Sequence, residues 1–380
     1  MVYPGLAMTS DINPIQSMSH PFDLPPNARV LVTGAAGYVG QALVEALALN
    51  APRSWQWVLT DTQSAEGART DANTRWVVGD LSEAWVCDAL FEQPVHAVVH
   101  LAGLMSGRTE QNVSLGERIN VHACLDLLAR CRAQYREGGP LVRWLMTSSI
   151  AVYGTPLPLR IDDHTPQRPS LSYGTHKRML ELMLDDMNRR GDLDGRAVRL
   201  SGVVLRPVLP NGALSGFNSD LIREPLLGRD YVCPVSPDAR LWLLSLPAAL
   251  AHLMRMLGLD HATWSQVMGP AGTCALNAPA WPVTVHEVLQ AMAQIDPQAP
   301  QRVQFAPQSE IEAQFGAWPL DVSFALARQL ALTDERQTFK RFDCICAPVG
   351  TTHLEPLNIH QHYRKNWHDH THTQTHFHAP

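Results

Sequence analysis

The amino-acid sequence predicts an α/β protein with a doubly wound parallel sheet. Three features lead to this prediction: short runs of apolar residues, helix-like segments that alternate with them, and a glycine cluster directly after the first run. Strands that are apolar throughout are typical of a parallel sheet that is covered by helices on both faces. The chain of 380 residues is long enough for such a domain together with a smaller lobe.

The alternating elements occupy the first half of the chain. Six strands are expected, at residues 30–32, 57–59, 76–78, 97–101, 143–146 and 197–200. Helices are expected at 38–49, 83–91, 117–132 and 173–189; in the first of them Val39, Leu43 and Leu47 share one face. This order predicts a cofactor-binding sheet domain over residues 28–205.

The pattern changes at residue 206, where proline and glycine become frequent. Helices are expected there at 248–257, 285–294 and 323–330. We interpret residues 206–348 as a smaller C-terminal substrate-binding lobe. Residues 1–27 are expected to be a flexible leader, and the His-rich residues 349–380 a disordered tail.

Composition and charge exclude several kinds of partner. The net charge is −6 and no block is rich in Lys and Arg, so we expect no nucleic-acid partner. No apolar run approaches the roughly 20 residues of a membrane span, and the start of the chain does not resemble a secretory signal. The seven scattered cysteines are typical of reduced thiols. We therefore expect a cytoplasmic protein without a membrane partner.

The glycine cluster reads TGAAGYVG over residues 33–40, between the first strand and the first helix. Free backbone N–H groups and the helix dipole at such a position favour a pyrophosphate, and glycines let the backbone approach it closely. The spacing Gly-x-x-Gly-x-x-Gly differs from the commoner Gly-x-Gly-x-x-Gly, and the alternative is a purely structural turn. The candidate cofactor-binding residues here are Gly34, Ala36, Gly37, Tyr38, Val39 and Gly40.

Two aspartates follow the next two strands. Asp61 is placed to accept hydrogen bonds from ribose hydroxyls and would repel a 2′-phosphate, which favours NAD over NADP. Asp80 is placed to meet the adenine. The alternatives are a turn residue at the end of the strand for Asp61 and a helix N-cap for Asp80.

Six elements, in order and in spacing, resemble the extended short-chain dehydrogenase/reductase family. They are the glycine cluster, Gly79-Asp80-Leu81, His100-Leu101-Ala102-Gly103, Asn120, the segment 148–154 (SSIAVYG) and the segment 173–177 (YGTHK). The resemblance implies a Rossmann fold, NAD as the cofactor, and Ser149, Tyr173 and Lys177 as the catalytic residues. It also places Leu81, Leu101, Ala102, Gly103, Asn120, Tyr173 and Lys177 at the cofactor. It further implies a homodimer formed through the 117–132 and 173–189 helices.

The spacing of Tyr173 and Lys177 has a chemical reason. Residues four apart project from the same face of a helix. A free tyrosine has a pKa of about 10 and is a poor base at neutral pH, whereas a neighbouring ammonium favours its phenolate. Tyr173 would then take the proton of a substrate hydroxyl that Ser149 holds by a hydrogen bond. For Asn120, by resemblance a support for a helix kink and a water near Lys177, the alternative is an exposed helix residue.

A narrower resemblance, to the D-erythronate dehydrogenases, covers most of the chain. It is carried by the segments 100–107 (HLAGLMSG), 206–211 (RPVLPN), 222–226 (IREPL), 232–235 (VCPV), 238–242 (DARLW) and 317–319 (AWP). It implies that NAD⁺ oxidises the C2 hydroxyl of a four-carbon sugar acid to a 2-oxo acid. Dehydration is disfavoured because Ile150-Ala151, and not an acidic pair, follows Ser149.

A sugar-acid substrate requires a cation for its carboxylate. Arg240 is the first candidate and Arg223 the second, since a guanidinium can bind a carboxylate with two parallel hydrogen bonds. The alternative for each is a structural ion pair. Ser106 and Asn211 are further substrate-binding candidates, with a loop cap and an ordinary turn as their alternatives.

The functional alternatives are a sugar-nucleotide epimerase and a non-catalytic NAD-sensing protein. No metal is assigned, because the histidines after residue 352 have no fixed scaffold and Cys344-Ile345-Cys346 has the wrong spacing for a zinc site.

Overall fold

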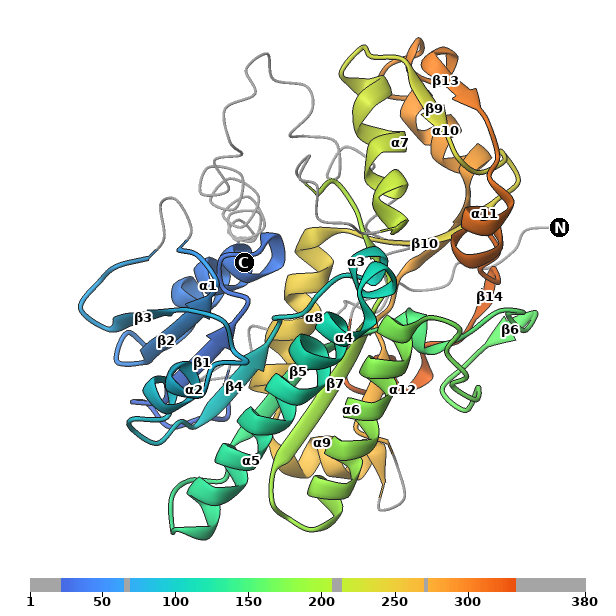
Figure 1. The fold of residues 1–380 in the computed structure, drawn as a ribbon. Coiled ribbons are helices and arrows are strands. Elements are labelled where there is room, and N and C mark those ends of the chain that lie inside the picture. The colour runs from blue at the N-terminus through green and yellow to red at the C-terminus, as the bar shows by residue number, and fades with distance from the viewer. Residues whose placement is uncertain (1–21, 65–68, 207–213, 270–272, 333–380) are drawn as a thin grey trace, which may run out of the picture.

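The computed structural model describes residues 22–64, 69–206, 214–269 and 273–332 (Figure 1). Its centre is a seven-stranded sheet in the order β11-β7-β5-β4-β1-β2-β3, and every pairing in this sheet is parallel. The strands are β1 (Arg29–Thr33), β2 (Gln56–Asp61), β3 (Thr74–Val78), β4 (Ala97–His100), β5 (Arg143–Ser149), β7 (Asp194–Leu200) and β11 (Ala275–Asn277). The predicted fold class is confirmed.

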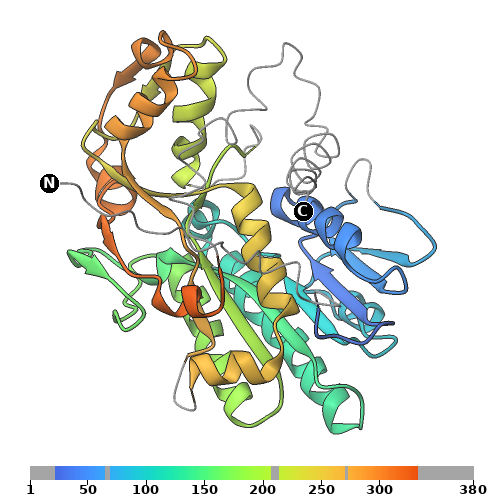
Figure 2. The same cartoon turned by 180° about the vertical axis from the view of Figure 1, so that it is seen from behind.

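Helices cover both faces of this sheet (Figures 1 and 2). On one face α6 (Ser172–Arg189) packs on β5 and β7, beside α5 (Ala123–Arg136) and the π-helix Glu117–His122. On the other face α8 (Leu246–Gly258) packs on the same two strands and contacts α1 (Tyr38–Asn50). The short helices are α2 (Ala84–Leu90), α3 (Ser106–Gln111), α4 (Val113–Gly116), α9 (His261–Met268) and α12 (Ala325–Gln329).

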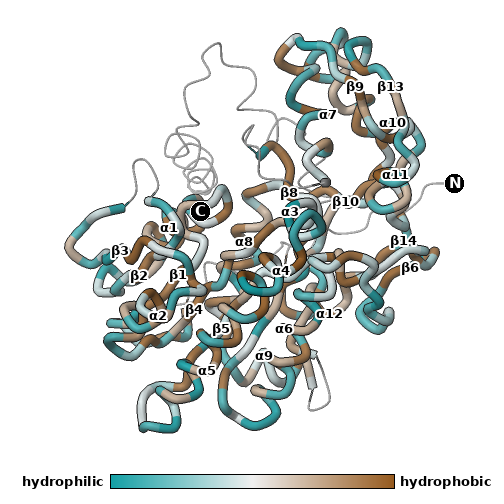
Figure 3. Tube along the Cα trace, viewed as in Figure 1, coloured by the Kyte–Doolittle hydropathy of each residue, from teal (hydrophilic) through white to brown (hydrophobic). Residues whose placement is uncertain are grey.

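A smaller lobe has an apolar core of its own, in which Leu221, Ile222, Val283 and Val288 are buried. Brown, apolar stretches alternate with teal, polar ones in both the sheet domain and this lobe (Figure 3). The lobe contains a three-stranded sheet of β8 (Gly202–Val203), β10 (Arg240–Leu244) and β12 (Trp281–Thr284). Its other elements are α7 (Phe217–Leu226), β9 (Tyr231–Cys233), α10 (Val285–Ala293), β13 (Val303–Phe305) and α11 (Ser309–Phe315). Strands β6 (Arg160–Ile161) and β14 (Asp321–Val322) pair with each other.

The chain returns from the lobe to the sheet domain before it ends. Helix α8 lies on the sheet, and Ala275 of β11 pairs with Ala197 of β7. Part of the predicted lobe, residues 246–269 and 273–277, therefore belongs to the sheet domain. A strand of three residues has too few positions to show a period, so no pattern in the sequence indicated β11.

The two ends of the chain were predicted to be unstructured. Phe22 is buried against Trp55, with ring centroids 5.1 Å apart. The folded part therefore begins before residue 27, where the predicted leader ends. The rest of the leader, residues 1–21, and the predicted tail lie outside the described residues. In the part of the chain that the structure describes, no helix combines the length and the apolar character needed to cross a membrane.

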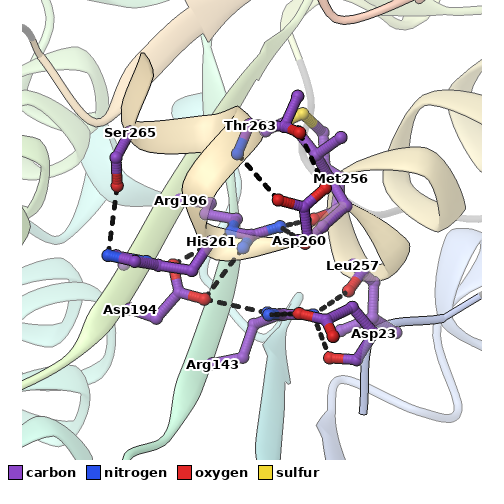
Figure 4. Close-up of polar contacts among 12 residues, drawn as sticks. Asp23, Arg143, Asp194, Arg196, Met256, Leu257, Asp260, His261, Thr263 and Ser265 are labelled. Carbon is purple, nitrogen blue, oxygen red and sulfur yellow. Dashed lines mark hydrogen bonds and ion pairs between the residues drawn. The ribbon is translucent and has the colours of Figure 1, made fainter. Parts of the chain in front are cut away.

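A charged network lies where β5 and β7 begin (Figure 4). Asp194 accepts hydrogen bonds from Arg143 Nε at 2.9 Å and from Arg196 Nη2 at 2.8 Å. Arg196 also donates to the carbonyl oxygen of Met256 at 2.6 Å, and Arg143 donates to that of Asp23 at 2.7 Å. The network therefore joins α8 and the start of the described chain to the amino ends of the strands.

Candidate active site

A cavity of about 710 Å³ lies at the opposite ends of the strands, between the sheet and the lobe. Its walls include residues at the carboxyl ends of the strands, such as Asp61, Ser149 and Leu200, and residues of the lobe, such as Asn218 and Trp242. Ligands of open parallel sheets bind in this position. Many of the predicted site residues line this cavity: Gly34, Gly37, Tyr38, Val39, Gly40, Asp61, Asp80, Leu81, Leu101, Ala102, Gly103, Ser106, Ser149, Tyr173 and Lys177.

The glycine loop has the geometry of an anion site. Gly34 has a φ of +70°, and a Cβ at this position would lie 2.7 Å from the backbone nitrogen of Ala102. Gly37 is the N-cap of α1 and has no side chain to offer to the N–H groups of the first turn. Because Gly37, Tyr38, Val39 and Gly40 line the cavity, this first turn of α1 fits the pyrophosphate of a dinucleotide.

The two predicted aspartates each have a backbone partner. Asp61 Oδ2 accepts a hydrogen bond from the N–H of Ala36 at 3.0 Å, so it holds the glycine loop against β2. Ala36 supports the loop in this way and does not line the cavity. Asp80 Oδ1 accepts from the N–H of Ser82 at 2.8 Å and therefore shapes the turn before α2. Their contacts with ribose and adenine stay predictions.

The three predicted catalytic residues line one part of the cavity. Ser149 ends β5, Tyr173 is the second residue of α6, and Lys177 follows one helical turn later. The Lys177 Nζ lies 5.7 Å from the centroid of the Tyr173 ring and donates to the carbonyl oxygen of Thr147 at 2.8 Å. Ser149 Oγ accepts from the N–H of Ala151 at 3.1 Å, which leaves its own proton for another acceptor.

A glycine brings Tyr173 and Ser149 together. A Cβ on Gly174 would lie 2.0 Å from the carbonyl oxygen of Ala151, so the first turn of α6 packs directly on the turn that follows β5. A side chain at position 174 would force these two elements apart. The sequence contained this glycine between the tyrosine and the lysine, but only the fold reveals what it contacts.

Asn120 lies in the π-helix, is 2% exposed, and does not line the cavity. Its Oδ1 accepts from the N–H of Leu104 at 2.6 Å, and its Nδ2 donates to the carbonyl oxygen of the same residue at 3.1 Å. It thus fixes the loop after β4. A Cβ on Gly103 would lie 3.3 Å from Asn120 Oδ1 and 3.8 Å from Lys177 Nζ, so the three residues are close neighbours. The alternative of an exposed residue is wrong, and the predicted water stays a prediction.

His100 supports, through Thr33, the backbone of Ala102 in the cavity wall. Its Nδ1 is hydrogen-bonded to Thr33 Oγ1 at 2.8 Å, and that oxygen accepts from the N–H of Ala102 at 3.3 Å. Burial, with a smaller contribution from the charge of Lys177, lowers the pKa of His100 to about 3. The imidazole is therefore neutral at pH 7 and adds no charge beside Lys177.

The structure does not bring the two predicted carboxylate-binding arginines to the cavity. Arg223 forms ion pairs with Asp220 and Glu224, which is the structural alternative foreseen for it. Arg240, on β10, is also absent from the cavity wall. Among the described residues, the cations that line the cavity besides Lys177 are Arg108 and Arg206. Asn211 lies outside the described residues.

The sequence analysis missed Arg206 as a candidate, although it begins the segment 206–211 that was compared with the dehydrogenases. An arginine beside a proline carries no local sign of the side that it faces. Its orientation depends on the lobe, whose strands come from distant parts of the chain.

Comparisons with known proteins agree with this geometry. The model of the NAD dependent epimerase/dehydratase family matches residues 30–237. A D-erythronate dehydrogenase of Cupriavidus necator is 37% identical over 312 residues, which cover 80% of this chain and 92% of that protein. The D-erythronate dehydrogenase of Haemophilus influenzae is 34% identical over 306 residues, 79% of this chain and 93% of that protein.

Among solved structures, a nucleoside-diphosphate-sugar epimerase from Agrobacterium tumefaciens superimposes with a TM-score of 0.72. It is 31% identical in sequence, and the match covers 81% of this chain and 90% of that one.

Proposed function

The chain belongs to the NAD dependent epimerase/dehydratase family, and from this premise we propose that it oxidises the C2 hydroxyl of a small sugar acid, with D-erythronate as the first candidate. The observation that supports this most is the convergence of Ser149, Tyr173 and Lys177 in a cavity that also contains arginine side chains. The cofactor is NAD, and the enzyme is a dehydrogenase.

Each of the three catalytic residues in the cavity has its own role in the proposed reaction. Bound NAD⁺ supplies the acceptor for the hydride that leaves C2. Ser149 donates a hydrogen bond to the reacting oxygen, and Tyr173 takes the proton of the hydroxyl as the carbonyl forms. Lys177 keeps a positive charge beside the Tyr173 ring while the carbonyl oxygen of Thr147 fixes its position. The products are a 2-oxo acid, NADH and one proton.

The cofactor site follows from the same arrangement. The first turn of α1 would hold the pyrophosphate, and Asp61 would accept from the ribose hydroxyls at the end of β2. This cavity must admit the dinucleotide and the substrate together.

A sugar-nucleotide epimerase is the second candidate, and the name of the Agrobacterium structure favours it. Such an enzyme would use the same tyrosine and lysine but would return the hydride to its substrate. It would form no net NADH. A non-catalytic NAD-sensing protein is a weaker candidate, because it would not require the three catalytic side chains.

One experiment separates these functions. The purified protein is incubated with NAD⁺ and, in turn, tetronates, hexuronates and UDP-sugars, while NADH is followed by its absorbance. NADH formation with a tetronate is the expected result. Interconversion of a UDP-sugar without NADH from any acid would contradict the proposal and support the epimerase.

A further inference from the structure

We infer that Arg206 binds the carboxylate of the substrate and that Asn218 accepts a hydrogen bond from one of its remaining hydroxyls, an inference that rests on the proposed function. Both side chains line the cavity that contains Tyr173. Arg206 follows β8 and Asn218 lies in the first turn of α7, so both residues are close in the sequence. They would bind the carboxylate and a hydroxyl of the same acid.

The backbone of Arg206 is held from two sides. Its N–H donates to Ser219 Oγ at 3.3 Å, and its carbonyl oxygen accepts from Arg223 Nη1 at 2.6 Å. Its guanidinium has long contacts with Ser215, 3.4 Å to the hydroxyl and 3.5 Å to the carbonyl oxygen. A guanidinium has five N–H donors, so these contacts leave donors for a carboxylate. Arg223 would thus support the substrate site indirectly.

The position of Arg206 relative to Tyr173 fits the chemistry of a 2-hydroxy acid. The carboxyl carbon is bonded directly to C2, whose hydroxyl must reach Tyr173. The cation that binds the carboxylate must therefore lie close to Tyr173. Arg206 and Tyr173 line the same cavity. Burial lowers the pKa of Arg206, and the charges of Tyr173, Tyr38 and Asp220 oppose this shift. Neither Arg223 nor Arg240 lines the cavity.

Arg108 is the other arginine of the cavity wall, but its side chain is exposed, whereas Arg206 is half-buried. Water and salt screen the charge of an exposed cation, and an ion pair there contributes little. A half-buried guanidinium interacts more strongly with an anion. Arg206 is for this reason the better carboxylate ligand of the two.

Asn218 supplies the complementary group. It is 5% exposed and lines the cavity, and its Oδ1 has no hydrogen-bond partner among the described residues. A Cβ at Gly202 would lie 2.7 Å from Asn218 Nδ2, so the close approach of β8 fixes where this amide lies. Buried amide oxygens are nearly always satisfied, because an unsatisfied one is costly. A substrate hydroxyl would provide the missing donor.

The test measures binding in the presence of NADH, with which the acid cannot react. The probes are D-erythronate and its uncharged amide, titrated by calorimetry into the wild type and into Arg206→Gln. We expect Arg206→Gln to weaken D-erythronate about 10- to 100-fold, and the amide hardly at all, since a hydrogen bond to a charged group is lost only for the acid. The affinity of Arg206→Lys for D-erythronate should lie between those of the wild type and Arg206→Gln. This second variant keeps the test valid if Arg206→Gln does not fold.

Matched variants make the result specific. Arg229→Gln removes an exposed arginine of the lobe that is paired with Glu224 and should leave both affinities unchanged. Arg108→Gln and Arg240→Gln test the competing arginines. Asn218→Ala should weaken D-erythronate about 3- to 10-fold and leave glycolate, which has no further hydroxyl, unaffected.

The outcomes separate the two proposals. Wild-type affinity of Arg206→Gln for D-erythronate, or a loss confined to Arg108→Gln or Arg240→Gln, would overturn the role of Arg206 and leave the proposed function intact. A wild type that binds D-erythronate through Arg206 but forms no NADH from it would overturn the proposed reaction and retain the carboxylate site. A wild type that binds no acid would overturn both.

Discussion

At the scale of single residues, the chemistry depends on a tyrosine and a lysine one helical turn apart. The Nζ of Lys177 lies 5.7 Å from the ring centroid of Tyr173, and Gly174 lets this turn of α6 pack on the end of β5. His100, which is buried nearby, is neutral at pH 7 because its pKa is lowered to about 3. It therefore does not repel the positive charge of Lys177. The phenol is therefore placed beside one fixed charge.

Substituting Tyr173 by phenylalanine removes the base and keeps the ring. We expect the kcat of Tyr173→Phe with a tetronate to fall about 10²- to 10⁴-fold, because a positioned proton acceptor contributes that much. NAD⁺ affinity, measured by calorimetry, should change little. Tyr135→Phe, on the exposed surface of α5, is the matched control. Turnover of Tyr173→Phe at the wild-type rate would remove this residue from the mechanism.

The structure brings the three predicted catalytic residues to the cavity but not the two predicted arginines, and there is a physical reason. The tyrosine and the lysine lie within one helix, where spacing along the chain determines the face. Arg206, Arg223 and Arg240 are arginines of one irregular lobe, and only tertiary packing decides which of them meets the cavity and which pairs with a neighbouring carboxylate.

At the scale of elements, a buried network connects α6 with two strands. Glu181 lies one turn beyond Lys177 and forms two hydrogen bonds of 2.8 Å with Arg199 of β7. The hydroxyl of Ser148, next to Ser149, donates to the same carboxylate at 2.6 Å. Because Glu181 and Arg199 are almost fully buried, this pair fixes α6, the helix of the lysine, against β7. The bond from Ser148 fixes the same helix against β5, the strand of Ser149.

Breaking this pair should be costly. Glu181→Gln leaves the guanidinium of Arg199 buried without its counter-charge, and we expect a loss of about 3–5 kcal/mol in the free energy of unfolding. Urea denaturation measures it, with the exposed Glu137→Gln as the control. The double variant Glu181→Met with Arg199→Met should recover part of the loss, because neither charge then remains buried. A Glu181→Gln protein as stable as the wild type would contradict the structural role of the pair.

The helices and strands of the first half could be predicted because each is long or strongly apolar. The predicted strand 143–146 extends to Ser149, and the predicted helix 173–189 starts one residue earlier, at Ser172. The π-helix was not predicted as such; within it, the side chain of Asn120 binds the backbone of Leu104 in the loop after β4. No periodicity records such a contact.

At the scale of the whole molecule, two polar assemblies lie at opposite ends of the strands. The cavity is at the carboxyl ends, and the network of Asp194, Arg143 and Arg196 is at the amino ends. The predicted homodimer stays a prediction, which the exposed Met179, Leu182 and Met183 on α6 favour.

Because of the network at the amino ends of the strands, the stability of the fold should depend on pH. Burial alone would raise the pKa of Asp194, but Arg196 and Arg143 outweigh it and lower the pKa below its ordinary 3.8. The stabilisation is therefore complete above about pH 4 and is lost as the pH falls through the lowered value. Asp194→Asn should cost about 3–5 kcal/mol at pH 7, and this difference from the wild type should shrink below pH 4.

Thermal denaturation at a series of pH values measures this difference. Asp88→Asn, whose carboxylate is exposed and paired with Arg130, serves as the control. A difference between the wild type and Asp194→Asn that stays constant down to pH 2 would show that the carboxylate charge is not what stabilises the fold.

The pairing of β11 with β7 has a consequence for the protein as it is synthesised. During synthesis Ala197 leaves the ribosome long before Ala275, with which it pairs. The edge of β7 that pairs with β11 therefore stays unpaired while the lobe segments between them are made. An unpaired strand edge can join another chain, and closing so long a loop slows the final step. Folding in the cell is thus most vulnerable in this interval, when a nascent chain would gain most from a chaperone.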